Sequence, residues 1–176
     1  YTVNVKVELS KADYDLSKAK FTDKTVAYDG QPHGIVIEGV LPDGVSLLYY
    51  EGGGKSVGRY TVYAVLSQED EKNYNAVGKL SANLVIEKGN YDMSGVVFAD
   101  DTVVYDGNKH TLVVSGRLPD GVSVSGYSED GYVNSGAYKI TVSFTQEDSE
   151  NYKKVNELSA TLTIMKAQCV FLDDTI

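Results

Sequence analysis

Short runs of alternating apolar and polar residues are the strongest structural signal in this chain. In an extended strand every second side chain lies on the same face, so each run has one apolar face to bury. Such runs predict the first set of strands at 20–21, 25–28, 34–38, 45–50, 59–66 and 80–87. The inward residues are expected to be Tyr60, Val62, Ala64 and Leu66, and in a later run Tyr138, Ile140, Val142 and Phe144. No window of about a dozen residues has a helical period, so the pattern predicts an all-β protein.

Turn motifs separate these runs, and the whole pattern occurs twice. Leu-Pro-Asp-Gly at 41–44 has Pro preset for the first turn position and Gly free to adopt positive φ, which predicts a hairpin. This motif returns at 118–121, and Tyr-Asp-Gly at 28–30 returns at 105–107. The spacing predicts two tandem, small immunoglobulin-like β-sandwich modules of about 77 residues each. They are placed at 14–90 and 91–168.

Partial copies flank the two modules. Val3, Val5, Val7 and Leu9 alternate as Leu80, Ala82, Leu84 and Ile86 do. Residues 1–13 are therefore interpreted as the closing strand of a preceding copy, and 169–176 as the start of a following copy. Since the chain opens directly into a strand-like run, we expect it to be part of a longer polypeptide. The phase of the repeat stays open, because the strand at 80–87 could also open a module.

The orphan strand at 3–9 needs a partner, because it has an apolar face and unpaired backbone groups. We expect it to dock on the first module or to pair with another molecule. A second expectation concerns Gly-x-Tyr at 58–60 and 136–138. Immunoglobulin-type sandwiches have a Tyr here whose hydroxyl bonds to the backbone, and we expect the same of Tyr60 and Tyr138. The two copies should differ mainly in the hairpins at 52–55 and 129–132, where one residue is inserted.

Composition narrows the range of partners. With 25 acidic and 16 basic residues the formal net charge is −9, which disfavours nucleic acid and anionic membrane surfaces. No apolar stretch is long enough to span a membrane, so direct membrane insertion is not expected. Cys169 is the only cysteine, which excludes an internal disulfide. Bacterial surface arrays often lack cysteine, and this composition suits such an array.

The motif series as a whole resembles one known family. The series comprises Tyr-Asp-(Leu/Met)-Ser, Thr-Val-x-Tyr-Asp-Gly, Leu-Pro-Asp-Gly-Val, Gly-x-Tyr, Asn-Tyr and a closing Leu-Ser-Ala-x-Leu-x-Ile-x-Lys. It is similar to the MBG family, the mostly-β, Ig-like repeats of bacterial surface proteins, over nearly the whole chain. The resemblance implies a secreted or wall-attached array, no catalysis and no common ligand. It also favours 80–87 as a closing strand.

Candidate catalytic and metal-binding residues are few. His33 and His110 follow the two Tyr-Asp-Gly turns without a second His or Cys at ligand spacing, so a turn histidine is favoured over a metal ligand or base. Asp29 and Asp106 are expected to bond backbone amides in those turns. The acidic loops at 68–74 and 146–152 lack the spacing of an EF-hand, which favours solvated loops, each anchored by a tyrosine, over calcium sites.

Other nucleophile, phosphate and cross-linking arrangements are also disfavoured. Gly52–Gly54 precedes no helix, which favours a hairpin tip over a phosphate-binding loop. Lys88 and Lys166 lie at strand ends, which argues against a Lys–Asn cross-link. We therefore expect no enzyme activity, no catalytic residues, no cofactor and no metal.

Tyrosine is the unusual component, with 14 residues and no Trp. The candidates for ligand contact are Tyr49, Tyr50, Tyr63, Tyr127 and Tyr132. Ordinary sheet-surface tyrosine is the favoured interpretation, although amphipathic rings also stack on sugars and peptides. Positions that differ between the copies, such as Tyr49 against Gly126, are the better ligand candidates, because the shared fold explains recurring ones.

These observations favour a non-catalytic, extracellular repeat segment of a bacterial cell-surface, adhesin-like protein that acts as a stalk or spacer. Its expected partners are the neighbouring modules, joined by a linker at 88–90 too short for a flexible tether. One alternative is a binding module for host or environmental glycan or protein through its exposed tyrosines. Another is an accessory segment of a large secreted carbohydrate-active enzyme.

Overall fold

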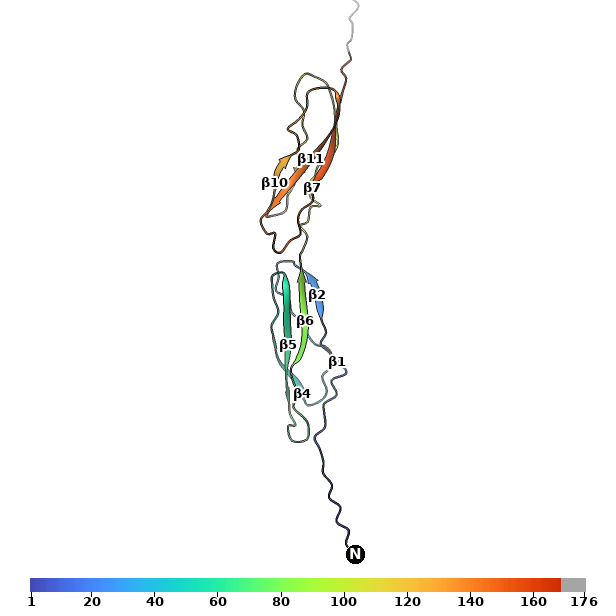
Figure 1. Cartoon of the computed structure of the whole chain (residues 1–176), viewed down its shortest axis with the longest axis vertical. Coiled ribbons are helices and arrows are strands. Elements are labelled where there is room, and N and C mark those ends of the chain that lie inside the picture. Colours follow the sequence, from blue (N-terminus) through green and yellow to red (C-terminus); the bar gives the residue numbers. More distant parts are fainter. Residues whose placement is uncertain (169–176) are drawn as a thin grey trace, which may run out of the picture. The chain divides into compact units, whose positions relative to one another are not determined.

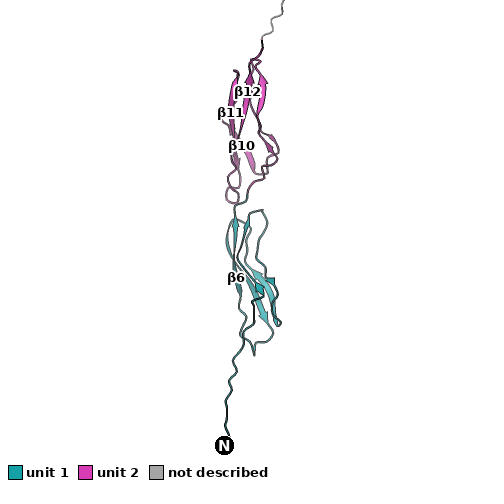
Figure 2. Ribbon diagram, turned by 90° about the vertical axis from the view of Figure 1, so that its right-hand side faces the viewer, with its two compact units in different colours: residues 1–89 teal, residues 90–176 magenta. Residues whose placement is uncertain are grey.

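The protein is all-β, as predicted. The computed structural model describes residues 1–168, and the secondary structure assigned in that range is strand, with no helix (Figure 1). No helix there could therefore cross a membrane. The chain divides into two compact units between Gly89 and Asn90 (Figure 2). The predicted partial copy at 169–176 lies outside the described residues.

Unit 1 is built on one four-stranded sheet with the order β2-β6-β5-β4. Its strands are β2 (Lys24–Ala27), β4 (Val45–Glu51), β5 (Gly58–Gln68) and β6 (Leu80–Glu87). A short two-stranded ladder joins β1 (Ala19–Lys20) to β3 (Glu38–Gly39). Strands β5 and β6 follow the alternation read from the sequence, whereas in β4 only Val45 is buried. Strand β5 extends two residues beyond the prediction at its C-terminal end.

Unit 2 has the same strand order, β10-β11-β12-β8 in its four-stranded sheet and β7-β9 in its short ladder. These strands are β7 (Val96–Val97), β8 (Asp101–Val104), β9 (Ser115–Gly116), β10 (Val122–Tyr127), β11 (Gly136–Gln146) and β12 (Leu158–Met165). Each unit also has a register irregularity in the equivalent edge strand, at Leu47/Tyr49 and at Val124/Gly126. Two residues oppose one across such a bulge, which re-aims the side chains beside it.

The first and last long strands of each unit are parallel neighbours. In unit 1, β2 pairs with β6 from Lys24↔Leu84 to Ala27↔Glu87 (Figure 1). The Tyr28 N–H then donates to the Glu87 carbonyl at 2.8 Å, which extends the pairing. In unit 2, β8 pairs with β12 in the same manner, and the Tyr105 N–H donates to the Met165 carbonyl at 2.9 Å.

The core of each unit lies against the inner face of its sheet. The buried clusters are Ile35, Val62, Ala82, Leu84 and Ile86 in unit 1, and Leu112, Ile140, Ala160, Leu162 and Ile164 in unit 2. Most predicted inward residues are confirmed: Val62, Ala64, Leu66, Ile140 and Val142 are buried. Tyr60, Tyr138 and Phe144 are half-buried. Burying such aliphatic side chains contributes roughly 1.5–3 kcal/mol each.

The predicted strand at 34–38 is wrong except at its last residue. Ile35 is buried, but the segment joins no ladder until Glu38 enters β3. The reason lies in its hydrogen bonding, because the Ile37 N–H donates to the Tyr50 hydroxyl at 2.9 Å instead of to a neighbouring strand. The segment thus supplies a core residue while a side chain satisfies its backbone.

Glycine is required where the short ladders close. Gly39 has a φ of +95°, and a Cβ there would overlap the Lys18 carbonyl oxygen. Gly116 has a φ of +85° and faces the Gly95 carbonyl in the same manner. Both positions combine a left-handed backbone with close backbone approach, which an L side chain cannot accommodate without strain.

The N-terminal segment is not docked on unit 1, so that prediction is wrong. Residues 3–9 belong to no strand, and their apolar side chains are 73–93% exposed. The position that their pattern matches is already filled by β6, whose Leu84 and Ile86 are 0% and 1% exposed. Backbone pairing with unit 1 begins at Ala12, whose N–H donates to the Asn73 carbonyl and whose carbonyl accepts from the Asn75 N–H. Pairing of residues 3–9 with another molecule stays a prediction.

Candidate functional site

The recurring histidines belong to turns. Asp29 Oδ1 accepts the Gln31 N–H at 2.8 Å and lies 2.8 Å from His33 Nε2. The equivalent Asp106 accepts the Asn108 N–H at 2.8 Å and lies 2.9 Å from His110 Nε2. This arrangement is an Asx-turn whose aspartate also anchors the imidazole.

Hydrogen bonds to the carboxylate lower the pKa of Asp106 to about 2, chiefly those from the Asn108 backbone and side chain, with a further one from His110. The pKa of Asp29 is lowered for the same reason, first by the Gln31 backbone N–H. Within residues 1–168, no three His, Cys, Asp or Glu side chains converge as they would around a metal ion. The acidity of these aspartates therefore reflects turn formation.

The acidic loops use their carboxylates internally. Asp70 Oδ1 accepts the backbone N–H groups of Lys72 and Asn73, and Asp148 Oδ1 accepts that of Asn151. Tyrosines hold the loop ends, since Tyr74 stacks on Tyr14 with ring centroids 4.1 Å apart. In unit 2, the Tyr152 and Tyr91 rings stack with the same 4.1 Å separation.

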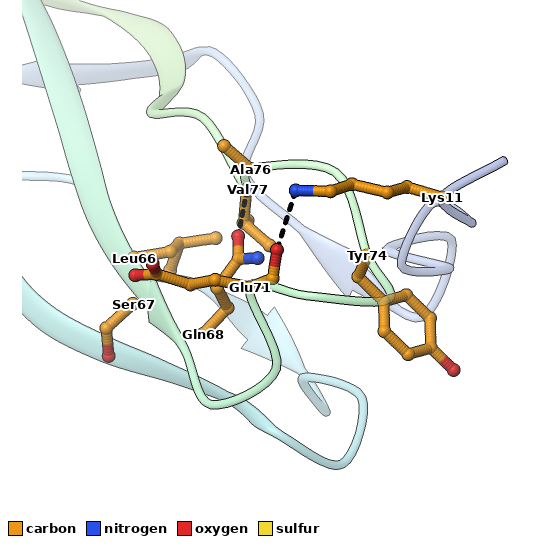
Figure 3. Close-up of a pocket in the computed structure, with 8 residues that line it drawn as sticks. All are labelled: Lys11, Leu66, Ser67, Gln68, Glu71, Tyr74, Ala76 and Val77. Carbon is orange, nitrogen blue, oxygen red and sulfur yellow. Dashed lines mark hydrogen bonds between the residues drawn. The ribbon is translucent and has the colours of Figure 1, made fainter.

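A hollow of about 500 Å³ lies over the first of these loops (Figure 3). Two hydrogen bonds cross it: Lys11 Nζ donates to the Glu71 carbonyl at 2.6 Å, and Gln68 Oε1 accepts the Val77 N–H (Figure 3). The hollow is thus walled by groups that close the loop, and we assign it no ligand.

The five candidate tyrosines separate into two classes. Tyr50 and Tyr127 recur at the same position, and each hydroxyl accepts a backbone N–H, from Ile37 at 2.9 Å and from Val114 at 3.0 Å. Tyr132 stacks on Tyr138, with ring centroids 3.8 Å apart and planes inclined by 8°. These three rings are explained by the fold.

Tyr49 and Tyr63 are different, because neither phenol group makes a hydrogen bond within the described residues. Tyr49 lies opposite Val65, and Tyr63 lies between Glu51 on β4 and Ser81 on β6. On β5, Tyr63 and Val65 alternate with the buried Val62 and Ala64, and Tyr49 pairs with Val65, so both tyrosines belong to the outer face of the sheet. Tyr49 is 54% exposed.

An ion pair crosses the same face. Lys79 Nζ lies 2.8 Å from Glu51 Oε2 and 5.3 Å from the centroid of the Tyr63 ring. The hydrogen bond and charge of Glu51 raise the pKa of Lys79. We call this surface the Tyr49–Tyr63 face, and it consists of Leu48, Tyr49, Glu51, Tyr63, Val65 and Lys79.

Unit 2 presents small polar residues at the corresponding place. A shallow hollow of about 400 Å³ is lined there by Ser125, Gly126, Tyr127, Ser128, Thr141, Ser143 and Glu157. Its side chains bond to their own neighbours: Ser143 Oγ donates to Glu157 Oε1 at 2.8 Å, and Ser128 Oγ accepts the Thr141 N–H at 3.0 Å. The aromatic face thus occurs in unit 1, and the equivalent strands of unit 2 form without it.

Sequence reasoning found Tyr49 by its difference from Gly126, but it missed Glu51 and Lys79. The same signal was available for both, because Ser128 and Glu157 occupy their positions in the second copy. Comparison of the sequence with models of known protein families gives no match. A search among curated proteins likewise finds no significant similarity. The resemblance to the MBG family stays a prediction.

Proposed function

We propose that this chain is a non-catalytic repeat segment of a bacterial cell-surface, adhesin-like protein, where it acts as a load-bearing stalk or spacer. The observation that carries the proposal is the parallel pairing of β2 with β6 and of β8 with β12. The resemblance of the repeat motifs to MBG modules and the net charge of −9, which favours solubility, are consistent with an extracellular array.

The direction of these strands determines how a unit meets tension. Because β2 and β6 run parallel, the start of β2 and the end of β6 lie at opposite ends of their shared ladder. Tension that enters near Lys24 and leaves near Glu87 therefore pulls the two strands past each other. All the hydrogen bonds of the ladder are then loaded together, whereas a hairpin pulled from its open end would lose its bonds one at a time.

The proposal is tested by pulling the whole chain from its two ends in single-molecule force spectroscopy. Tyr105→Pro removes the N–H that donates to Met165 at 2.9 Å, because proline has no amide hydrogen. Tyr105→Ala is the matched control, since it removes the exposed ring and keeps that N–H. Forced unfolding is governed by the unfolding rate, so the weakened ladder should appear directly as a lower force.

We expect two unfolding events in the wild-type chain. Tyr105→Pro should lower the force of one event and leave the other unchanged, so that unit 1 serves as a reference within each molecule. Equal forces for the proline and alanine variants would refute the load-bearing ladder. The proposed location on the cell surface has its own test, which is whether protease added to intact cells cleaves the full-length protein.

A further inference from the structure

We propose that the Tyr49–Tyr63 face of unit 1 binds a neutral glycan. The face combines an exposed tyrosine, a second half-buried ring and two apolar side chains, Leu48 and Val65, around the Glu51–Lys79 ion pair. This is a function beyond that of a stalk, and it does not depend on the load-bearing ladder.

The fold does not require these side chains. The bulged edge strand and its neighbours form equally in unit 2, where Gly126 stands for Tyr49 and Thr141 stands for Tyr63. Recurring tyrosines such as Tyr50 bond the backbone, but Tyr49 and Tyr63 do not. Aromatic surface that neither packs a core nor satisfies the backbone has an unfavourable contact with water, which a ligand would remove.

The chemistry of the face matches a sugar. The C–H faces of a pyranose ring are apolar and can cover a phenol ring, while its hydroxyl groups both donate and accept hydrogen bonds. Glu51 provides acceptor oxygens and Lys79 provides N–H donors, and Lys79 Nζ lies 2.8 Å from Glu51 Oε2. Neighbouring sugar hydroxyls can therefore bond to both ions without separating them.

Charge and geometry disfavour other ligands. A charged ligand would compete with the 2.8 Å ion pair, and an anion would also approach a chain of net charge −9. An extended peptide could add to the free edge of β4, but the register shift between Leu47 and Tyr49 interrupts the regular ladder that such pairing needs. A neutral ligand that stacks on the face meets neither obstacle.

The test uses the whole chain on an array of immobilised neutral, sialylated and sulfated oligosaccharides, followed by NMR titration with the neutral ones retained. We expect binding to neutral glycans, with amide shifts on β4, β5 and around Lys79. Tyr49→Ser and Tyr63→Thr should each weaken binding by about tenfold, as loss of a buried aromatic anchor does. Tyr1→Thr is the control, because Tyr1 is fully exposed outside the face.

A gain-of-binding variant serves as a control, because a substitution that only misfolds unit 1 could also abolish binding. Gly126 has ordinary φ and open space where a Cβ would lie, so Gly126→Tyr introduces no backbone clash. With Thr141→Tyr, Ser128→Glu and Glu157→Lys it transfers both tyrosines and the ion pair of the face to unit 2, and it should add a second neutral-glycan site. Binding to none of the neutral glycans, binding only to charged ones, or affinity unchanged by both tyrosine substitutions would overturn the proposal.

Discussion

The bond between a tyrosine hydroxyl and the backbone allows a sharp test of how these units are held together. Tyr127→Phe keeps the ring that packs on the core and against Phe98, with centroids 6.0 Å apart, and removes only the oxygen that accepts the Val114 N–H. That N–H belongs to the segment that carries Leu112 into the core, and no strand replaces the lost acceptor.

The magnitude follows from the surroundings of the bond. A backbone N–H left without a partner in a part-buried place costs about 1–3 kcal/mol, and partial access of water places this case near 1–2 kcal/mol. The equivalent bond of Tyr50 is more exposed, so Tyr50→Phe should cost nearer 0.5–1 kcal/mol. For units of this size, each kcal/mol lowers the melting temperature by about 4–8 °C.

Calorimetry combined with amide hydrogen exchange measures both effects. Tyr127→Phe should lower the melting transition of unit 2 and speed exchange at Val114. Tyr105→Phe is the matched control, because that hydroxyl makes no hydrogen bond within the described residues. If Tyr127→Phe keeps the wild-type midpoint and Val114 stays protected, the hydroxyl is not the acceptor that holds this segment.

Three further outcomes are expected. Tyr60→Phe and Tyr138→Phe, which remove hydroxyl bonds of 2.8 and 3.0 Å to exposed backbone carbonyls, should each cost about 0.5–1 kcal/mol in urea unfolding, and no change in either midpoint would contradict these bonds. Gly39→Ala should destabilise unit 1 by roughly 1–3 kcal/mol, because a positive φ and the Lys18 carbonyl both oppose the new methyl group; a stability equal to wild type would show that the ladder can shift. Asp106 has a pKa lowered to about 2, so the stability it contributes is complete above its unfolded value near 3.8 and is lost as pH falls through about 2. Asp106→Asn should therefore flatten the fall in melting temperature between pH 4 and pH 2, and an unaltered pH profile would count against this linkage.

The alternation of apolar and polar residues predicted correctly those strands that pair with other strands. The run at 59–66 forms β5 because its apolar side chains pack on the core and the side chains between them face solvent. The segment 34–38 has the same kind of pattern, but a tyrosine side chain hydrogen-bonds its backbone, and alternation carries no information about that partner. The exposed residues 3–9 show the same limit, because a sequence with strand character does not specify which strand pairs with it.

The Tyr49–Tyr63 face was only partly predictable. Comparison of the copies identified Tyr49, but Tyr50 beside it was grouped with it, because the sequence does not reveal which phenol reaches a backbone N–H. The pairing of Glu51 with Lys79 joins residues 28 positions apart, and it follows from strand register and not from local spacing. Register became visible only in the structure.

The parallel ladders also fix the order in which a unit can be completed. Lys24 pairs with Leu84, so β2 waits unpaired while the rest of the unit is made. The Asp23 side chain similarly accepts the Asn83 N–H across a separation of 60 residues. Contacts this distant form late, because the intervening chain must first be ordered. In a polypeptide that emerges N-terminus first from a ribosome, neither unit can therefore complete its four-stranded sheet until that unit's own last strand, β6 or β12, has emerged.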